Sequence, residues 1–339
     1  MEKYTFKDFK SDQEVRWCPG CGDHAVLAAL QRAMPRVSEI LGYKKERYVV
    51  VSGIGCSSRL PYYMDTYGFH SIHGRATAVS TGIKVANPEL SVWQACGDGD
   101  ALAIGGNHFI HAVRRNIDIN IILFNNRIYG LTKGQYSPTS KFGAITKTSP
   151  YGTVEHPFNP GSLVLGAKGT FFARGLDTEL KLNEEIMVAA AVHNGTSVME
   201  MLTNCVIFNN GAHAEIADRA YREDRTIVLR HGEKMIFGKN RDRGLVLDGL
   251  KLKVVTIGEK GITEDDILTH DAHSDNIGIH MMLADMKYPE YPVALGVIRD
   301  VNDITYDAAV RMQVEQVTEK SKIHCVDDLL HSGSIWEVK

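Results

Sequence analysis

Residues 91–100, SVWQACGDGD, form an apolar run that leads directly into a glycine–aspartate turn. A second apolar run, residues 119–124, ends at Asn125-Asn126. Residues 101–116 lie between them and have a helical pattern. We predict a strand, a helix and a neighbouring strand, because this alternation is typical of parallel sheets whose two faces are covered by helices.

The same alternation extends over the first two thirds of the chain. Short β-branched and apolar runs predict further strands at residues 48–52, 170–174 and 196–202. Helical spacing predicts helices at 23–37, 75–86 and 177–193, the last capped by Asp177 and stopped by Gly195. The expected fold is α/β, a mostly parallel sheet flanked by helices, with ligands bound beyond the carboxyl ends of the strands.

The remaining segments follow other patterns. Residues 132–169 are rich in Gly, Pro, Ser and Thr and predict an ordered functional loop or a mobile cover. After residue 210 we expect short strands at 234–255 and helices over 263–287 and 308–320. We therefore divide the chain into a core, residues 1–210, and a C-terminal extension, residues 211–339, packed on the core or on a partner.

Bulk composition excludes several classes of protein. The chain has 339 residues, 44% of them hydrophobic, and a net charge of -3 without a long basic run, which argues against nucleic acid or an anionic membrane as partner. It contains no run of about 20 apolar residues and no signal-peptide pattern, so we expect a cytoplasmic protein. In that reducing compartment, six cysteines are expected to bind metal, do redox work or fill the core.

The chemistry of the GDG turn suits a diphosphate and a hard metal ion. Gly97 and Gly99 let the backbone approach a ligand, and the following helix start favours phosphate. Asp98 would repel a bare phosphate unless a divalent cation such as Mg²⁺ lay between them. Asn126, after the next strand, can supply a second oxygen, and the carbonyl of Ile128 a third.

The cysteines suggest a second kind of site. Cys18 and Cys21 have the spacing of a metal clamp, which fits zinc, a redox dithiol or an iron–sulfur cluster. No strand precedes them, which counts against a thioredoxin-like dithiol. Cys56 and Cys205 follow strand ends, but spacing alone leaves open whether they join the clamp. Cys96, inside a strand, is expected to be buried in the core.

Several motifs together carry a specific resemblance. They are WCPGCG at 17–22, GCS at 55–57, HGR at 73–75, GDG at 97–99, YGLTKGQ at 129–135 and SPT at 137–139. This series, within residues 15–210, resembles the β subunit of 2-oxoacid:ferredoxin oxidoreductases and is most similar to the 2-oxoglutarate branch. The resemblance implies the thiamine-diphosphate-binding fold.

The resemblance also implies the site residues. A [4Fe–4S] cluster would be held by Cys18, Cys21, Cys56 and Cys205, and Mg²⁺ by Asp98, Asn126 and the Ile128 carbonyl. The turn 130–132 would lie near the diphosphate. The residues expected to bind the thiamine cofactor are Gly55, Cys56, Ser57, His73, Gly97, Asp98, Gly99, Asp100, Asn126, Gly130, Leu131 and Thr132.

The implied reaction is oxidative decarboxylation of a 2-oxoacid, or the reverse carboxylation, with coenzyme A as acyl acceptor and ferredoxin as electron partner. Thiamine enzymes need a carboxylate against the aminopyrimidine ring, and no glutamate here is a convincing candidate. The resemblance implies that an α subunit supplies it, in an αβ or α2β2 complex. Arg59 and Lys133 are candidates for binding substrate carboxylates, and His73 for a contact with the thiazolium, although a structural role for this histidine is equally open.

Two other functions remain open from the sequence. The same fold and cofactors would serve an enzyme for pyruvate or a branched-chain 2-oxoacid. The cysteine pair alone would also fit a zinc-clamped binding module without catalysis.

Overall fold

The computed structural model describes residues 3–336 and 338 of the chain. Within these residues the central sheet has eight strands in the order β2-β1-β3-β4-β6-β5-β11-β7. All neighbouring pairs are parallel except β11 with β5. The strands are β1 Tyr48–Ser52, β2 Tyr67–His70, β3 Ser91–Gly97, β4 Asn120–Asn125, β5 Phe171–Leu176, β6 Ser197–Leu202, β7 Thr226–Leu229 and β11 Val293–Asp300.

Alternating side chains of the strands feed two separate hydrophobic clusters, one on each face of the sheet. In β1, for example, Val50 belongs to one cluster, and Val49 and Val51 belong to the other. Helices α1 Asp23–Leu41 and α6 Leu180–Val192 cover the first face. Helices α3 Ala76–Ala86, α4 Gly106–Arg115, α5 Pro160–Gly166 and α9 Ile277–Asp285 contribute to the second cluster. Burial on both faces explains why the strands read as continuous apolar runs.

Most of the predicted core elements are confirmed, with differences at their ends. The first helix runs to Leu41, through Pro35. The helix predicted at 101–116 is divided into a π-helical turn, η4 Asp100–Ile104, and α4. The predicted Asp177 cap is wrong, because α6 begins at Leu180 and the Asp177 carboxylate accepts from the backbone N–H of Asn204 instead. Cys96 is buried, as expected.

Short helical segments connect these elements. They are η1 Phe6–Phe9, η2 Lys45–Arg47, η3 Ser57–Arg59, α2 Leu60–Tyr63, α7 Ala214–Ala217, α8 Arg222–Arg225 and η5 Glu264–Asp266.

The chain after residue 210 does more than pack against the core, because β7 and β11 extend the central sheet. The strands predicted at 234–255 are confirmed as an antiparallel sheet of β8 Ile236–Phe237, β9 Arg243–Asp248 and β10 Lys251–Thr256. The helix predicted over 263–287 is wrong for most of its length, since α9 covers only its last part.

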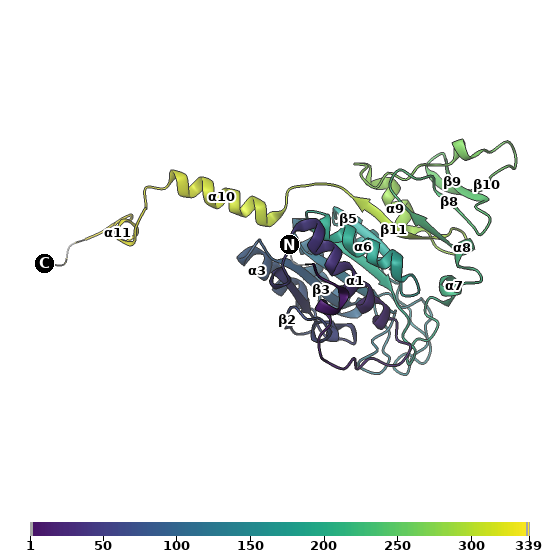
Figure 1. Ribbon diagram of the computed structural model, residues 1–339, viewed down its shortest axis with the longest axis horizontal. Helices are drawn as coiled ribbons and strands as arrows, with labels where there is room; N and C mark the ends of the chain where they lie inside the picture. Colours follow the sequence, from purple (N-terminus) through teal and green to yellow (C-terminus); the bar gives the residue numbers. More distant parts are fainter. Residues whose placement is uncertain (1–2, 337, 339) are drawn as a thin grey trace.

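The last helices extend away from the body of the molecule. Figure 1 shows α10 Tyr306–Lys320 and α11 Val326–Leu330 beyond the end of the sheet. The prediction of a helix at 308–320 is therefore confirmed. None of the helices in the described part of the chain combines the length and apolar character needed to cross a membrane.

Candidate functional site

A cavity of 420 Å³ lies where β1, β3 and β4 end. Thirteen residues predicted to bind thiamine diphosphate or Mg²⁺ line it: Gly55, Cys56, Ser57, His73, Gly97, Asp98, Gly99, Asp100, Asn126, Ile128, Gly130, Leu131 and Thr132. Ile54, Tyr129 and Gln135 complete the lining. The fold thus brings together four segments that are far apart in the sequence, at the strand ends where parallel sheets bind ligands.

Asp98 is a buried carboxylate within this cavity. Ser137 and Thr139 each donate a hydrogen bond to its Oδ2 atom, both at 2.5 Å. Burial raises the pKa of Asp98 to about 6, although these two hydroxyls partly oppose the shift. Within residues 3–336 and 338, Asp98 forms no direct ion pair, and only the more distant Arg127 acts on its charge, so a direct charge balance is missing. A divalent cation would supply that balance, and the site therefore fits Mg²⁺.

The backbone around Asn126 is held by two hydrogen bonds. Its Oδ1 atom accepts from the N–H of Ile128 at 3.1 Å, and its carbonyl accepts from the Asn209 side chain at 2.9 Å. These contacts keep Asn126 and Ile128 in one compact turn beside Asp98. Carboxylate, amide and carbonyl oxygens are the ligands Mg²⁺ prefers, so the residues fit the predicted ion, and their role as ligands stays a prediction.

Asp100 joins the loops around the cavity. Its Oδ1 atom accepts from the backbone N–H groups of Ile54 and Gly74 at 3.1 and 2.7 Å. His73 Nδ1 lies 2.7 Å from the same oxygen. A carboxylate only accepts, so His73 Nδ1 carries a proton and donates it to Asp100. His73 is 38% exposed at its side chain and lines the cavity.

Gly99 permits a close contact at this site, and Gly130 lies in ordinary van der Waals contact with two cysteine sulfurs. A Cβ atom on Gly99 would lie 2.2 Å from the ring of Tyr129, whose hydroxyl donates to the Gly99 carbonyl at 3.0 Å. A Cβ atom on Gly130 would lie 3.5 Å from the Cys205 sulfur and 3.6 Å from the Cys56 sulfur. Gly130 and Cys56 both line the cavity, so the thiols of Cys56 and Cys205 lie close to its wall.

Hydrogen bonds join the segments that carry the four predicted cluster cysteines. The indole N–H of Trp17 donates to the Cys56 carbonyl at 2.6 Å, and the N–H of Gly22 donates to the Asn204 carbonyl at 3.1 Å. These bonds hold the 18–21 loop against the Cys56 loop and the Cys205 loop. Cys18 is exposed, and the other three are partly buried.

The four cysteine thiols are free, and the surroundings of Cys21 and Cys56 favour the protonated form. Burial, followed by the charge of Asp23, raises the pKa of Cys56 to about 11. The same two causes raise the pKa of Cys21 further. Bound iron would displace these protons, because thiolate is the metal-binding form of cysteine.

Across residues 3–336 and 338, no group of three or more His, Cys, Asp and Glu side chains is arranged to hold a metal ion. The predicted Mg²⁺ site would not form such a group, because its ligands are one carboxylate, Asp98, the side-chain amide of Asn126 and the backbone carbonyl of Ile128. A four-iron cluster is larger than a single ion, and its thiolates bind different irons. The convergence of Cys56 and Cys205 on Gly130 is the feature that fits a cluster.

The structure places the two predicted substrate contacts outside the cavity lining. Arg59 donates to the carbonyl of Arg16 at 3.1 Å and lies near Cys56. Lys133 is exposed in the turn that follows Gly130, with a φ angle of 78°. Contact with substrate therefore stays a prediction for both residues.

Sequence reasoning assigned no role to several polar residues around Asp98. Ser137 and Thr139 belong to the SPT motif, which was noticed only as part of the resemblance. Asn125, Glu200 and Arg174 are buried and hydrogen-bonded to one another. A charged residue inside an otherwise apolar strand, as at positions 174 and 200, is the signal that could have identified them.

Known proteins resemble the chain over most of its length. The 2-oxoglutarate oxidoreductase subunit KorB of Mycobacterium tuberculosis is 48% identical over 335 residues, 98% of this chain and 88% of that protein. The 2-oxoglutarate synthase subunit KorB of Archaeoglobus fulgidus is 49% identical over 189 residues, 56% of this chain and 69% of that protein. A solved structure of 2-oxoglutarate:ferredoxin oxidoreductase from Magnetococcus marinus, with 2-oxoglutarate, coenzyme A and succinyl-CoA bound, has a TM-score of 0.78 at 31% identity, covering 99% of this chain and 98% of that chain.

Residues 53–201 match the family described as thiamine pyrophosphate enzyme, C-terminal TPP binding domain. The parallel sheet and this match define a thiamine-diphosphate-binding α/β fold, which confirms the predicted fold class. Because the 48% identity to the first of these relatives extends over 98% of the chain, the chain belongs to the family of 2-oxoacid:ferredoxin oxidoreductase β subunits, as the motifs predicted.

Proposed function

We propose that this chain is the cofactor-binding subunit of a coenzyme A-dependent 2-oxoglutarate:ferredoxin oxidoreductase. It would convert 2-oxoglutarate to succinyl-CoA and CO₂, or run the reverse carboxylation. The main supporting observation is that Asp98 and Asn126 line the same cavity as Cys56, so that a thiamine site and a thiol site share a wall. The names of the relatives support the choice of 2-oxoglutarate.

Different residues of the cavity would bind different parts of the cofactor. Bound thiamine diphosphate supplies the electron sink for decarboxylation. Asp98, Asn126 and the Ile128 carbonyl would hold Mg²⁺ against its diphosphate, and the start of η4 adds backbone N–H groups. Asp100 holds the His73 ring through Nδ1, which would leave Nε2 for a contact with the cofactor or substrate in the cavity.

The cysteines would supply the electron-transfer site. Cys18, Cys21, Cys56 and Cys205 would bind one [4Fe–4S] cluster, and because Cys56 and Gly130 line the cavity, the path from thiamine diphosphate to the cluster would be short. Ferredoxin would be the external electron partner. Residues 1–210 would form this cofactor-binding core, and residues 211–339 the extension that completes the sheet.

A second subunit is part of the same proposal. No glutamate lines the 420 Å³ cavity in the described part of the chain, so the carboxylate that thiamine enzymes require would come from an α subunit in an αβ or α2β2 complex. The complex would be cytoplasmic, because all six cysteines are free thiols and cysteines stay reduced in that compartment.

The test is purification of the full chain with its co-expressed partner, followed by ferredoxin reduction with a panel of 2-oxoacids and coenzyme A. We expect a brown complex that absorbs broadly near about 400 nm, as thiolate-bound iron clusters do, and highest kcat/KM with 2-oxoglutarate. Preference for pyruvate or a branched-chain 2-oxoacid would refute the substrate assignment. A colourless protein that contains zinc would refute the enzyme assignment.

A further inference from the structure

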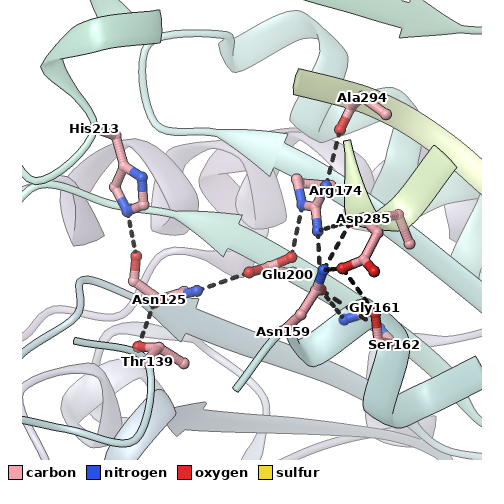
Figure 2. Close-up of polar contacts among 11 residues, drawn as sticks. Asn125, Thr139, Asn159, Gly161, Ser162, Arg174, Glu200, His213, Asp285 and Ala294 are labelled. Atoms are coloured by element: carbon pink, nitrogen blue, oxygen red, sulfur yellow. Dashed lines mark hydrogen bonds and ion pairs between the residues drawn. The ribbon is translucent and has the colours of Figure 1, made fainter. Parts of the chain in front are cut away.

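The side chain of Asn125, the neighbour of the predicted ligand Asn126, is buried and engaged on both sides. Its Nδ2 group donates to Glu200 Oε1 at 2.7 Å (Figure 2). Its Oδ1 atom lies 2.9 Å from the Thr139 hydroxyl. The Thr139 hydroxyl also donates to Asp98 Oδ2, so its single proton is shared between the two acceptors. Asn125 therefore connects Glu200 with the carboxylate of the predicted Mg²⁺ site.

The backbone of Asn125 is held as well. Its carbonyl accepts from His213 Nε2 at 2.9 Å and from the N–H of Thr203 at 3.1 Å. Burial lowers the pKa of His213 to about 3, so this imidazole is neutral at physiological pH and Nε2 carries the donated proton. Asn125 thus has hydrogen-bond partners on its backbone carbonyl and on both the Nδ2 and Oδ1 atoms of its side chain. These contacts fix the end of β4, from which the chain continues to Asn126.

Glu200 owes its orientation to Arg174. The two residues are direct neighbours in β6 and β5, and Arg174 Nε donates to Glu200 Oε2 at 2.7 Å. Their side chains are only 6% and 3% exposed. One carboxylate oxygen thus accepts from the guanidinium and the other from Asn125. Because a carboxylate accepts at both oxygens, it also determines that the Asn125 amide nitrogen faces β6.

The C-terminal third holds the other side of the guanidinium. Arg174 Nη2 donates to the Ala284 carbonyl at 3.1 Å, and Nη1 to the Ala294 carbonyl at 3.5 Å. Asn159 lies against the same Nη2 atom and donates to Asp285 at 2.7 Å. Figure 2 shows Ala294, Asn159 and Asp285 around the guanidinium of Arg174, on the side away from Asn125. The guanidinium is therefore locked on both sides, which suits its rigid fork of donors.

We propose that Arg174 and Glu200 are positioning residues for the Mg²⁺–thiamine diphosphate site, acting through Asn125 and Thr139 on Asp98 and Asn126. The inference rests on the proposed function, because it assumes that Asp98 and Asn126 hold the ion. It gives residues 277–300 a role in the cofactor site, since their carbonyls hold Arg174.

Energetics favour a positioning role over a purely stabilising one. A buried ion pair recovers its desolvation cost only when geometry and remaining hydrogen bonds are good, and apolar residues of similar volume often stabilise a protein equally well. A pair that served only stability would therefore need no contact toward the cavity. Here one carboxylate oxygen is directed at Asn125, and residues that orient metal ligands in this way commonly govern metal affinity.

The test compares three variants of the full chain, each co-purified with its partner subunit. Glu200→Gln leaves only one accepting oxygen at this position. The double variant Arg174→Met/Glu200→Met removes the pair without leaving an unpaired charge. Asp118→Asn breaks another largely buried ion pair, with Lys84 at 2.6 Å, near the start of β4 and away from the cavity. The readouts are the Mg²⁺ concentration for half-maximal thiamine diphosphate binding, the thermal midpoint and the iron content.

We expect Glu200→Gln and the double variant to need about 10- to 100-fold more Mg²⁺, the range seen when the partners of metal ligands are changed. Asp118→Asn should lower the thermal midpoint without changing the Mg²⁺ requirement, and iron should be unchanged in all three. If Glu200→Gln does not fold, the double variant carries the test.

The inference is overturned if the double variant keeps the wild-type Mg²⁺ requirement, whether or not its thermal midpoint changes. Wild-type Mg²⁺ dependence in Glu200→Gln would overturn it as well. Absence of Mg²⁺-dependent thiamine diphosphate binding in the wild-type complex would instead refute the proposed function, so the two failures are distinguishable.

Discussion

The Asp98 site and the cysteine site lie at the same edge of the sheet but are built in different ways. Around Asp98, side chains hold one another, through Ser137, Thr139 and Asn125. The cysteine loops are joined mainly through backbone groups, and their thiols are free. The first site is therefore organised before an ion binds, and the second would be completed by the iron it holds.

The largest expected effect is at the cysteine site. Cys21→Ser should reduce cluster iron in the purified complex to near zero and abolish ferredoxin reduction, because one of the four thiolates is lost. Mg²⁺-dependent binding of thiamine diphosphate should be retained, since Cys21 does not line the cavity. Iron analysis and absorbance measure the outcome.

Cys325→Ser is the matched control, because Cys325 is exposed and lies outside the predicted ligand set. Its iron content should equal that of the wild type. Full cluster iron in Cys21→Ser would show that the ligand set is wrong.

At the Asp98 site we expect the reverse pattern. Asp98→Asn should weaken Mg²⁺-dependent binding of thiamine diphosphate by more than about 100-fold, beyond the range for residues that only support a ligand, with cluster iron retained. Titration of Mg²⁺ at fixed thiamine diphosphate measures this.

The same substitution two residues later, Asp100→Asn, provides the control. All three donors to Asp100 reach its Oδ1 atom, which an asparagine oxygen can replace. Its Mg²⁺ requirement should stay within about threefold of wild type, as ligand loss costs far more. Equal losses in the two variants would remove Asp98 from the ligand set.

The pH dependence of stability offers a third test. Folding raises the pKa of Asp98 from 3.8 to about 6. Between these values the folded chain keeps a proton that the unfolded chain has released, so ionisation of Asp98 costs stability as pH rises through this window. Without Mg²⁺, Asp98→Asn should be more stable than wild type by about 1–3 kcal/mol near pH 7.5, and equally stable near pH 4.

Denaturant unfolding at the two pH values measures the difference, and saturating Mg²⁺ with thiamine diphosphate should reverse it. A constant difference across this pH range would show that Asp98 does not titrate on folding as described.

The smallest expected effect concerns thiol reactivity before the cluster is assembled. Cys56 has a pKa raised to about 11 by burial, and Cys18 and Cys325 are exposed. Near pH 8, iodoacetamide should label Cys56 at least about tenfold more slowly than the exposed pair, because the thiolate reacts. Mass spectrometry of peptides measures the rates, and equal rates would contradict the described packing of the cysteine loops.

Local patterns were sufficient to predict much of the fold. Continuous apolar strands such as residues 119–124 were found because both faces of a parallel sheet are covered. β11 was missed because Gly296 has a φ angle of 92° and the register shifts between Val297 and Arg299, which breaks a simple strand pattern. The helix at 101–116 is interrupted at Gly105, which packs closely against Gly74 of a distant segment, a contact that no local pattern reveals.

The sequence by itself determined the chemistry of the turns: GDG at 97–99, the Asn125-Asn126 pair and the CPGC clamp follow directly from residue type and spacing. The tertiary structure decided which distant side chains support them. The strand order places β6 between β4 and β5, so Glu200 lies between Asn125 and Arg174. Strand order depends on long-range pairing and burial, which no local pattern encodes, and it brings the charges that surround the cofactor site together.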